Sequence, residues 1–431
     1  MRPKRRPKRR RDPTRDESLL IENMAPTGEG VARLDGKAVF VPQTLPGERA
    51  RVRVHTGYKV WRGELLALEQ ASQDRVEPSC PHASRCGGCN WMHVASEARE
   101  RLHREHVVQA LQSVAKLEAE ALVYHRPTSE TGYRTRARWH LSAPSGVGFL
   151  RPRSKKLVRI DRCQVLDPAL AELPSLLAQL LKNSKGQGEA LTALGFNGLP
   201  VLELRWKGDL GVDAFGLAAR WIEEGRFAGI RFWPEEASRP TQWGDPRPQV
   251  TSADGRRISM APDGFSQASQ AGGALLAERV ASLLGPVSGR LIELFAGSGT
   301  LTMALAGCLQ GDGASLVAVE EFPDAVEQLR ENLRLHKVER SKVKVADANT
   351  FVLPRPIRAV VLDPPRGGAP GSCEQIVRAR PRRVVYVSCN PATLARDLLV
   401  LTGGGYRIAA VELFDLFAQT SHLETVVLLE R

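Results

Sequence analysis

Leu291-Ile-Glu-Leu-Phe-Ala-Gly-Ser-Gly-Thr300 is the stretch of sequence that decides the fold. Its mostly apolar first half has the length of a buried strand, and it runs into a loop with two glycines and then a helical pattern. A strand that enters a helix through such a loop is typical of a doubly wound α/β sheet. We therefore expect parallel strands and helices to alternate from about residue 264 onwards.

Four later strand-like runs continue this alternation, and a helical stretch from Pro323 to His336 lies among them. The runs are Ser315–Glu320, Val343–Val345, Ala359–Leu362 and Arg383–Val387. Ligands of an open parallel sheet bind beyond the carboxyl ends of its strands. The sequence thus predicts a Rossmann-like α/β domain whose site residues stand just after these runs, whereas the stretch from Lys182 to Pro248 has only weak patterns and no recognisable chemistry.

Three features at strand ends favour a nucleoside cofactor. In the glycine loop a dinucleotide-binding sequence would have a third Gly or Ala at position 302, which is Thr302 here, so a close pyrophosphate is disfavoured. S-adenosylmethionine has no pyrophosphate and needs only backbone near its methionine part. Glu320 is placed to accept hydrogen bonds from ribose hydroxyls, and Asp347 to reach the adenine. The alternative for these features is a tight turn and two surface acids.

Two motifs further on bear on the reaction. Asp363-Pro-Pro-Arg366 follows the fourth strand, and Ser388-Cys-Asn-Pro391 follows the fifth. An aromatic residue after Asp-Pro-Pro would favour methylation of an exocyclic amine, with the ring stacked on the base. Here arginine follows instead, and Cys389 stands one strand away. An N-methyltransferase remains an alternative, and in it Cys389 would have no role.

Cys389 and Glu424 are the residue types that methylation of uracil carbon 5 requires. That carbon is a poor nucleophile until a thiolate adds to C6, and a base must later remove the C5 proton so that the thiol can leave. Cys389 is the candidate nucleophile, and Glu424, in His422-Leu-Glu-Thr-Val-Val427, is the candidate base. The alternatives are a structural cysteine and an ordinary strand-end acid. The target base must be flipped or unpaired, because a thiolate cannot reach C6 inside a stack.

Cysteines at positions 80, 86, 89 and 163 suggest a metal site. The chain has seven cysteines, and three of these four fall within ten residues, in Cys80-x5-Cys86-Gly-Gly-Cys89. In a reducing compartment this spacing favours metal binding over disulfides. Zinc and an iron-sulfur cluster both accept four thiolates, so the spacing leaves the metal open. Buried ordinary cysteines are the alternative, and Cys163 as a fourth ligand argues against a radical enzyme with an open iron.

The N-terminal part combines a basic arm with a small β unit. Of the net charge of +13, eight positive charges lie between Arg2 and Arg11, which leaves about +5 for the rest (13 − 8). We expect the arm to be disordered and to attract phosphates without specificity, or to act as a solubilising or targeting tail. Short apolar runs from about Ser18 to Leu68, separated by turn signals, predict a β-barrel. Such a barrel is a common oligonucleotide platform, or simply a small β domain.

A second basic region lies between Tyr133 and Arg162, with aromatic residues among its cations. Alternation in Tyr133-Arg-Thr-Arg-Ala-Arg-Trp-His-Leu141 would place arginines on one sheet face, as a phosphate-contacting surface with Tyr133, Trp139 and Phe149 available for stacking. A solvated sheet face is the alternative. Upstream, Ser96 to Glu118 predicts an amphipathic helix with one apolar side that packs on a larger domain; that side carries Leu102, Val107, Leu111 and Val114.

Composition predicts a cytoplasmic protein of two or three domains. The chain has 431 residues, of which 42% are hydrophobic. Its longest apolar run, Leu291 to Leu309, is interrupted by Glu293 and by glycines, so we expect no membrane span. The basic N-terminus leads into acids instead of an apolar segment, which argues against a secretory signal.

Taken together, the motifs resemble the RNA uracil-5 methyltransferase family over nearly the whole chain after the arm. The resemblance rests on the four cysteines, Gln267 in Phe265-Ser-Gln-Ala-Ser269, Phe295-Ala-Gly-Ser-Gly299, Glu320, Asp363-Pro-Pro-Arg366, Ser388-Cys-Asn-Pro391 and His422-Leu-Glu-Thr-Val426. It implies a TRAM domain, a 4Fe-4S cluster and a Rossmann-like methyltransferase domain. The branch with both TRAM domain and cluster acts on 23S ribosomal RNA, and this chain is most similar to that branch.

The resemblance also implies roles for single residues. Cys389 would be the nucleophile and Glu424 the base, with the cluster on Cys80, Cys86, Cys89 and Cys163. The expected S-adenosylmethionine contacts are Gln267, Phe295, Thr300, Glu320, Asp347 and Asp363. The implied division is a basic disordered arm (1–15), a TRAM-like barrel (16–74), a central α+β iron-sulfur and RNA-binding domain (75–95 and 125–260) and the methyltransferase domain (96–124 and 261–431), in a monomer.

Three departures from the family pattern touch the cofactor contacts. The loop reads Ala296-Gly-Ser-Gly-Thr300 where the family usually begins with cysteine, Ser269 replaces an asparagine, and Asp347 stands where some members have asparagine. These changes bear on cofactor affinity more than on mechanism, because the pair Cys389 and Glu424 is intact. A tRNA uracil-5 methyltransferase and a non-catalytic RNA-binding protein remain as alternatives.

Overall fold

The computed structural model describes residues 13–115, 122–143, 145–262 and 264–431. Most of the expected basic arm, residues 1–12, lies outside these described residues, as does the end of the expected helix, residues 116–118. The chain divides into two compact units. One contains the N-terminal barrel together with residues 89–106 and 419–421, and the other contains residues 85–88 and most of the chain after Val107.

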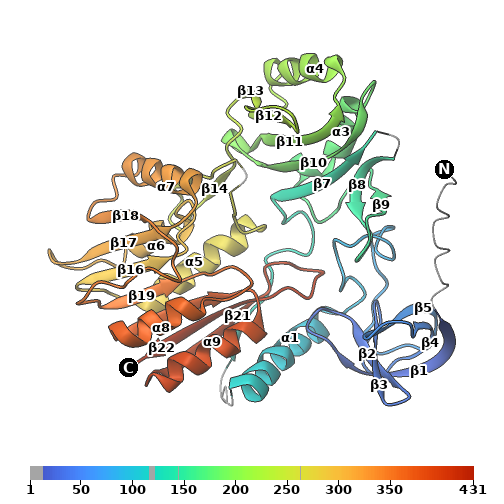
Figure 1. The fold of residues 1–431 in the computed structure, drawn as a ribbon, viewed down its shortest axis with the longest axis horizontal. Helices are drawn as coiled ribbons and strands as arrows, with labels where there is room; N and C mark the ends of the chain where they lie inside the picture. The colour runs from blue at the N-terminus through green and yellow to red at the C-terminus, as the bar shows by residue number, and fades with distance from the viewer. Residues whose placement is uncertain (1–12, 116–121, 144, 263) are drawn as a thin grey trace, which may run out of the picture. The chain divides into compact units, whose positions relative to one another are not determined.

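A closed barrel forms the N-terminal part of the first unit (Figure 1). Alternation builds it: in one strand Ala50, Val52 and Val54 are fully buried, while the arginines between them point outwards. Glycine is required at position 63, because a Cβ there would lie 2.3 Å from a Val52 methyl group. The strand order is β1-β2-β3-β5-β4, with β1 at Thr14–Met24, β2 at Gly30–Leu34, β3 at Lys37–Val41, β4 at Arg49–His55 and β5 at Trp61–Gln70.

A mixed sheet with helices on one face begins the second unit. Its strand order is β13-β12-β11-β10-β7-β8-β9, with bounds Arg136–Ser142 (β7), Gly146–Leu150 (β8), Leu157–Arg159 (β9), Lys185–Leu194 (β10), Pro200–Asp209 (β11), Gly229–Pro234 (β12) and Thr241–Gly244 (β13). The helices are α2 (Pro168–Ala171), α3 (Leu173–Leu180) and α4 (Val212–Glu223). Leu177 and Trp221 from these helices share one core with Trp139 and Leu204 of the sheet.

The aromatic residues of this sheet are not where the sequence placed them. Alternation in β7 does point Arg136 and Arg138 away from the core, as expected. Trp139, however, is fully buried and stacks on Phe149 with ring centroids 4.6 Å apart, and the Tyr133 hydroxyl donates to the Ala418 carbonyl. The expectation that Tyr133 and Trp139 are available to stack on RNA bases is therefore wrong, because both side chains are buried, whereas Phe149 is only partly buried.

A doubly wound sheet forms the C-terminal part, as predicted. Its order is β18-β17-β16-β19-β20-β22-β21-β6, with bounds Arg290–Leu294 (β16), Ser315–Glu320 (β17), Ser341–Val345 (β18), Ala359–Leu362 (β19), Arg383–Ser388 (β20), Arg407–Phe414 (β21), Glu424–Glu430 (β22) and Leu122–His125 (β6). Its pairs are parallel except those of β22, which runs antiparallel between β20 and β21. The first five strands have the 3-2-1-4-5 order typical of nucleotide-binding sheets.

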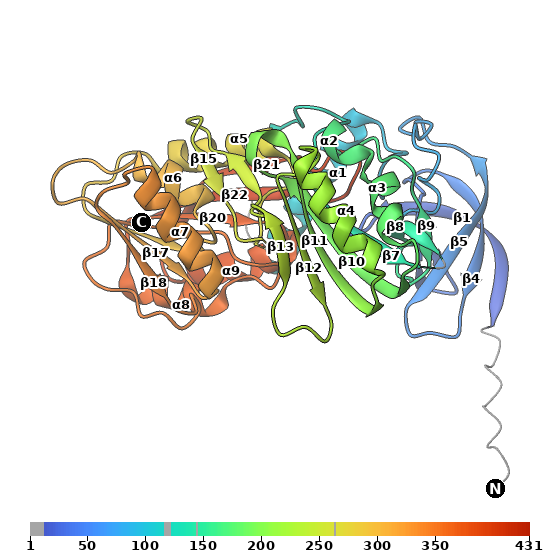
Figure 2. The ribbon, with the colours of Figure 1, turned by 90° about the horizontal axis from the view of Figure 1, so that it is seen from above.

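Alternate side chains of β19 pack in two hydrophobic cores, one on each face of this sheet. Val360 and Leu362 contact the core that includes α8 (Pro370–Ala379) and α9 (Pro391–Gly403). Ala359 and Val361 contact the core that includes α5 (Gln270–Leu284) and α6 (Thr300–Ala306). Figure 2 shows helices on both sides of these strands. A sheet buried on both faces explains why its strands read as continuous apolar runs in the sequence.

Helix α1 (Ser96–Ala110) continues into a π-helical segment, Leu111–Ala115. Val107 and Leu111 are buried in the core of the doubly wound sheet, as expected for the apolar side of this helix. Val114 is 41% exposed, so its expected place on that side is wrong. A π turn holds more residues than an α turn, and this rotates Val114 away from the apolar side. No helix in the described ranges has the length and apolarity to cross a membrane.

Candidate active site

Asp363 and Cys389 follow directly after the adjacent strands β19 and β20, as the sequence predicted. Their loops are bonded to one another. The Asn390 side-chain amide donates to the Arg366 carbonyl at 3.3 Å, and the Thr393 hydroxyl donates to the same carbonyl at 3.2 Å. Asn390 also caps α9. The start of that helix thus ties the cysteine loop to the Asp363-Pro-Pro-Arg366 loop.

Strand register brings Cys389 and Glu424 to the same place. Ser388 of β20 pairs with Thr425 of β22, and because these strands are antiparallel, the residue after Ser388 faces the residue before Thr425. An antiparallel strand begins at the edge where its parallel neighbours end. Glu424, the first residue of β22, therefore lies at the carboxyl edge of the sheet, beside Cys389.

The Glu424 carboxyl is 3% exposed and acts as a hydrogen-bond acceptor for the Gln267 amide. Burial raises its pKa well above the ordinary range, and the nearby Asp363 adds to the rise. The Gln267 hydrogen bond and Arg366 oppose it. This carboxyl consequently holds its proton more tightly than an exposed glutamate does.

The Cys389 thiol has a pKa raised to about 11. Burial is the largest cause, and Glu424 and Asp363 add to it, whereas the Arg366 guanidinium lowers the pKa. Two acids and one cation thus act on a single half-buried thiol. In the ligand-free protein this thiol is protonated at neutral pH.

Asp363 is half-buried. Desolvation raises its pKa to about 7. Because it also raises the pKa of Cys389 and of Glu424, it belongs to the same electrostatic cluster. A proton added to any one of these three groups makes ionisation of the others easier.

The glycine loop after β16 has an unusual backbone. Phe295, half-buried, has a φ of 62°, a conformation that a bulky residue adopts only when its surroundings impose it. Gly297 and Gly299 also have positive φ, of 55° and 100°. A Cβ at Gly299 would lie 2.5 Å from a Leu329 methyl carbon, whereas a Cβ at Gly297 would meet nothing within 4 Å. The loop therefore presents open backbone on one side.

Glu320 holds this loop from the end of β17. One carboxylate oxygen accepts the Gly297 N–H at 2.8 Å, and the other accepts the N–H groups of Glu321 and Phe322 at 2.9 and 3.0 Å. The carboxylate is 7% exposed. Each carboxylate oxygen has two lone pairs, so the oxygen that accepts the Gly297 N–H can accept one further donor, such as a ribose hydroxyl.

Glu293 is a site residue that the sequence analysis missed. It lies within β16 and is 2% exposed, and burial raises its pKa to about 8, with Asp363 and Glu320 as nearby acids. Its Oε2 atom is buried without a hydrogen-bond partner among the described atoms. The sequence does carry a signal for it, since a single acid interrupts an otherwise apolar strand, but the same interruption also argues against a membrane span and so does not identify a site.

Thr135 and Arg136, at the start of β7, hydrogen-bond to the segment that carries Gln267. The Arg136 guanidinium donates to the Gly264 carbonyl at 2.9 Å, and the Thr135 N–H donates to the Ala268 carbonyl at 2.7 Å. Ser269 then caps α5. Arg136 is thus occupied by backbone and is not part of an open phosphate-contacting surface. The Gln267 Oε1 atom is buried with no hydrogen-bond partner in the described structure.

The remaining expected cofactor residues are Thr300, at the start of a helix, and Asp347, just after a strand end. Thr300 is the first residue of α6. Asp347, exposed, follows β18 and accepts the Asn349 N–H at 2.9 Å. Neither residue is as tightly enclosed as Glu320 or Glu424.

The cysteines at 80, 86, 89 and 163 are all half-buried. Cys80 and Cys89 belong to the first unit, and Cys86 and Cys163 belong to the second, where both contact the core of the central sheet. No disulfide joins cysteines in the described part of the chain, and no group of three potential metal ligands is found there.

Known proteins resemble this chain along most of its length. A family model described as tRNA (Uracil-5-)-methyltransferase matches residues 313–431, and a TRAM domain model matches residues 17–61. A relative from Pseudomonas putida, named 23S rRNA (uracil(1939)-C(5))-methyltransferase RlmD, is 34% identical, with 96% of this chain and 93% of the relative covered. A protein of the same name from Halomonas elongata is also 34% identical, over 96% of this chain and 89% of its own length.

A solved structure shares the fold. The Pyrococcus abyssi tRNA (uracil-54, C5)-methyltransferase, determined in complex with S-adenosyl-L-homocysteine, superimposes with a TM-score of 0.74 and 22% identity. The match covers 96% of this chain and all of that one.

Proposed function

Since this chain belongs to the RNA uracil-5 methyltransferase family, we propose that it methylates carbon 5 of a uracil in 23S ribosomal RNA, with S-adenosylmethionine as the methyl donor. The observation that carries the proposal is the β20–β22 register, which sets a thiol beside a buried carboxyl at the carboxyl edge of the sheet. Two relatives named for 23S ribosomal RNA, and a TRAM domain model that matches the barrel, support the choice of RNA.

Cys389 and Glu424 divide the reaction between them. The Cys389 thiolate adds to C6 of the uracil, which places negative charge on C5 and makes that carbon nucleophilic. S-adenosylmethionine, when bound, supplies the methyl group from a positively charged sulfur. Glu424 then takes the C5 proton, and the bond between C6 and the Cys389 sulfur breaks to release the methylated base. Glu424 acts here in its ionised form, and its raised pKa makes that carboxylate a stronger base for this proton transfer.

The residues around the glycine loop fit such a methyl donor. Gln267 and Glu293 each keep a buried oxygen without a partner among the described residues, and such atoms are costly unless a ligand satisfies them. Gly297 offers backbone with open space in front of it. We propose that Gln267, Phe295, Thr300, Asp347 and Asp363 contact the cofactor together with Glu320, whose one remaining lone pair, on Oε2, suits a ribose hydroxyl.

The pKa of Cys389 makes the activity dependent on pH. With a pKa of about 11, only about one thiol in 10⁴ is ionised at pH 7, and each added pH unit increases that fraction about tenfold. Deprotonation produces the reactive form, so we expect kcat/KM to rise with pH between about 7 and 9.5. A radiolabelled methyl-transfer assay across this range tests the expectation. A profile that stays flat would show that a neighbouring group already removes the proton.

The substrate can be identified directly. The purified protein is incubated with labelled S-adenosylmethionine and either 23S ribosomal RNA or bulk tRNA, each lacking the modification, and the product nucleoside is identified by mass spectrometry. We expect 5-methyluridine in the ribosomal RNA. Label in tRNA alone would keep the chemistry and refute the ribosomal substrate, and label on an exocyclic amine would refute the uracil-5 reaction.

We further propose a 4Fe-4S cluster on Cys80, Cys86, Cys89 and Cys163. Thiolates are the ligands that iron-sulfur clusters use, and the core contacts of Cys86 and Cys163 hold two of the four sulfurs beside one apolar core. Anaerobically purified protein should contain about four iron and four sulfide per chain and absorb visible light.

A single substitution tests this cluster. Cys163→Ser should lose most of the iron, the sulfide and the colour. Cys308→Ser, which changes a half-buried cysteine elsewhere in the fold, should retain all three. Stoichiometric zinc in place of iron, or full iron in Cys163→Ser, would refute the proposed ligation.

We propose that the enzyme works as a cytoplasmic monomer. The proposed domains are residues 16–74, residues 75–95 with 125–260, and residues 96–124 with 261–431, after an arm of residues 1–15. Sedimentation of the purified protein tests the monomer, and limited proteolysis tests the boundaries.

A further inference from the structure

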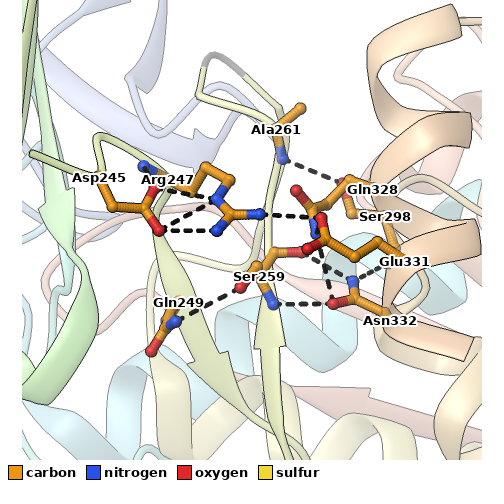
Figure 3. A network of polar contacts seen from close by, with 9 residues as sticks. All are labelled: Asp245, Arg247, Gln249, Ser259, Ala261, Ser298, Gln328, Glu331 and Asn332. Carbon is orange, nitrogen blue, oxygen red and sulfur yellow. Dashed lines mark hydrogen bonds and ion pairs between the residues drawn. The ribbon is translucent and has the colours of Figure 1, made fainter. Parts of the chain in front are cut away.

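The Asn332 side chain ties three separate segments together. It projects from α7 (Pro323–Leu335), is 1% exposed, and has its amide hydrogens fully used (Figure 3). The amide nitrogen donates to the Ser298 carbonyl at 2.9 Å and to the Ser259 carbonyl at 2.8 Å. The amide oxygen accepts the Ser259 N–H at 3.2 Å. Asn332 therefore pairs with both backbone groups of Ser259, as a neighbouring strand would.

The segments that meet at Asn332 are the two that approach the candidate cofactor site. Ser298 lies in the middle of the glycine loop. Ser259 ends β15 (Arg257–Ser259), whose hairpin partner is β14 (Gln249–Thr251), and the chain continues from β15 to Gln267. The two segments also meet directly, because the Ala261 N–H donates to the Ser298 hydroxyl at 3.3 Å. One buried amide thus fixes the glycine loop relative to the start of the Gln267 segment.

Helix α7 itself is firmly anchored on either side of this amide. One turn earlier, Leu329 packs against Gly299, the last glycine of the loop. At the adjacent position the Glu331 carboxylate accepts from Arg247 at 2.8 Å, and the same guanidinium donates to both oxygens of Asp245, at 2.9 Å to Oδ1 and 2.8 Å to Oδ2 (Figure 3). A bidentate arginine pair has a defined geometry. Asn332 is consequently held where small movements of the loop would cost its hydrogen bonds.

We propose that Asn332 is a positioning residue for S-adenosylmethionine binding, which acts through Ser298 on the glycine loop and through Ser259 on the Gln267 segment. The inference rests on the proposed function for the identity of the cofactor. Its physical basis is independent of the RNA substrate, since a buried amide that satisfies three backbone groups cannot be replaced without leaving some of them unpaired.

Asn332→Asp is the sharpest test, because it keeps the shape and replaces two donors by an oxygen that faces two carbonyl oxygens. S-adenosylhomocysteine binding to the full-length protein, measured by titration calorimetry without RNA, should weaken by about tenfold or more, the effect of one lost buried hydrogen bond. The KM for S-adenosylmethionine should rise more than kcat falls. Hydrogen exchange should accelerate at residues 296–300 and 259–262, with no change in β19 or β20.

Two further variants complete the design. Asn332→Ala loses the same donors without adding charge, and it replaces Asn332→Asp in these measurements if the aspartate variant does not fold. Glu327→Gln, on the exposed side of α7, should behave as wild type in each measurement. Wild-type affinity and wild-type exchange in a folded Asn332 variant would overturn the inference. Wild-type protein that binds S-adenosylhomocysteine but methylates no RNA would refute only the proposed function. The hydrogen-exchange measurement needs no ligand, so it tests the contacts of Asn332 with Ser298 and Ser259 in either case.

Discussion

Cys389→Ala should abolish methyl transfer. Without a thiolate to add to C6, carbon 5 of the uracil stays a poor nucleophile, and losses of about 10⁶-fold are typical when a covalent nucleophile is removed. The half-buried position of Cys389 suggests that the smaller side chain will be accommodated with little loss of stability. Initial rates with labelled S-adenosylmethionine and unmodified 23S ribosomal RNA measure the effect.

Two controls separate loss of chemistry from loss of binding. S-adenosylhomocysteine affinity of Cys389→Ala should match that of wild type, and Cys308→Ser should keep full activity, since Cys308 lies away from the candidate site. Substantial methylation by Cys389→Ala would mean that the reaction does not need a covalent bond to this sulfur. In that case an N-methyltransferase would become the better interpretation.

Glu424→Gln should accumulate a covalent complex of protein and RNA. Addition of Cys389 and methyl transfer do not require the carboxylate, but the C5 proton must leave before the sulfur can, so the reaction stops at the methylated adduct. Turnover should fall by about 10²- to 10⁴-fold, the usual contribution of a general base. Denaturing gel electrophoresis with labelled RNA should show a slowly migrating band that carries the methyl label.

Glu430→Gln, at the other end of the same strand, is the matched control and should turn over normally without a covalent band. The double variant Cys389→Ala with Glu424→Gln should form no band, because the linkage is to that sulfur. If Glu424→Gln released methylated product at the wild-type rate, another group would have to be the base.

The strand ends were predictable from sequence because this sheet is buried on both faces. Continuous apolar runs mark its strands, and each ends in a polar motif, so Asp363 and Cys389 could be placed before the structure was known. The position of Glu424 opposite Cys389 was not predictable from periodicity alone. It depends on β22 running antiparallel between two strands, and an apolar run carries no information about its direction or its neighbours.

Other features escaped because they depend on contacts between distant segments. Arg136 looks like a solvent-facing cation in its alternating strand, yet it bonds a carbonyl 128 residues away. Asn332 looks like an ordinary helical asparagine, and its role depends on Ser259 and Ser298. The long strands β10 and β11 have only weak patterns in the sequence, although they pair with each other as a hairpin across the short connection 195–199.

The place of β22 in the sheet has a consequence for how the protein is made. This strand leaves the ribosome after both of its neighbours, yet it lies between them. Until it inserts, β20 and β21 each expose an unpaired edge that could pair with another chain. When β22 fills that gap it covers both edges and brings Glu424 beside Cys389, so the same folding step completes the sheet and the candidate site.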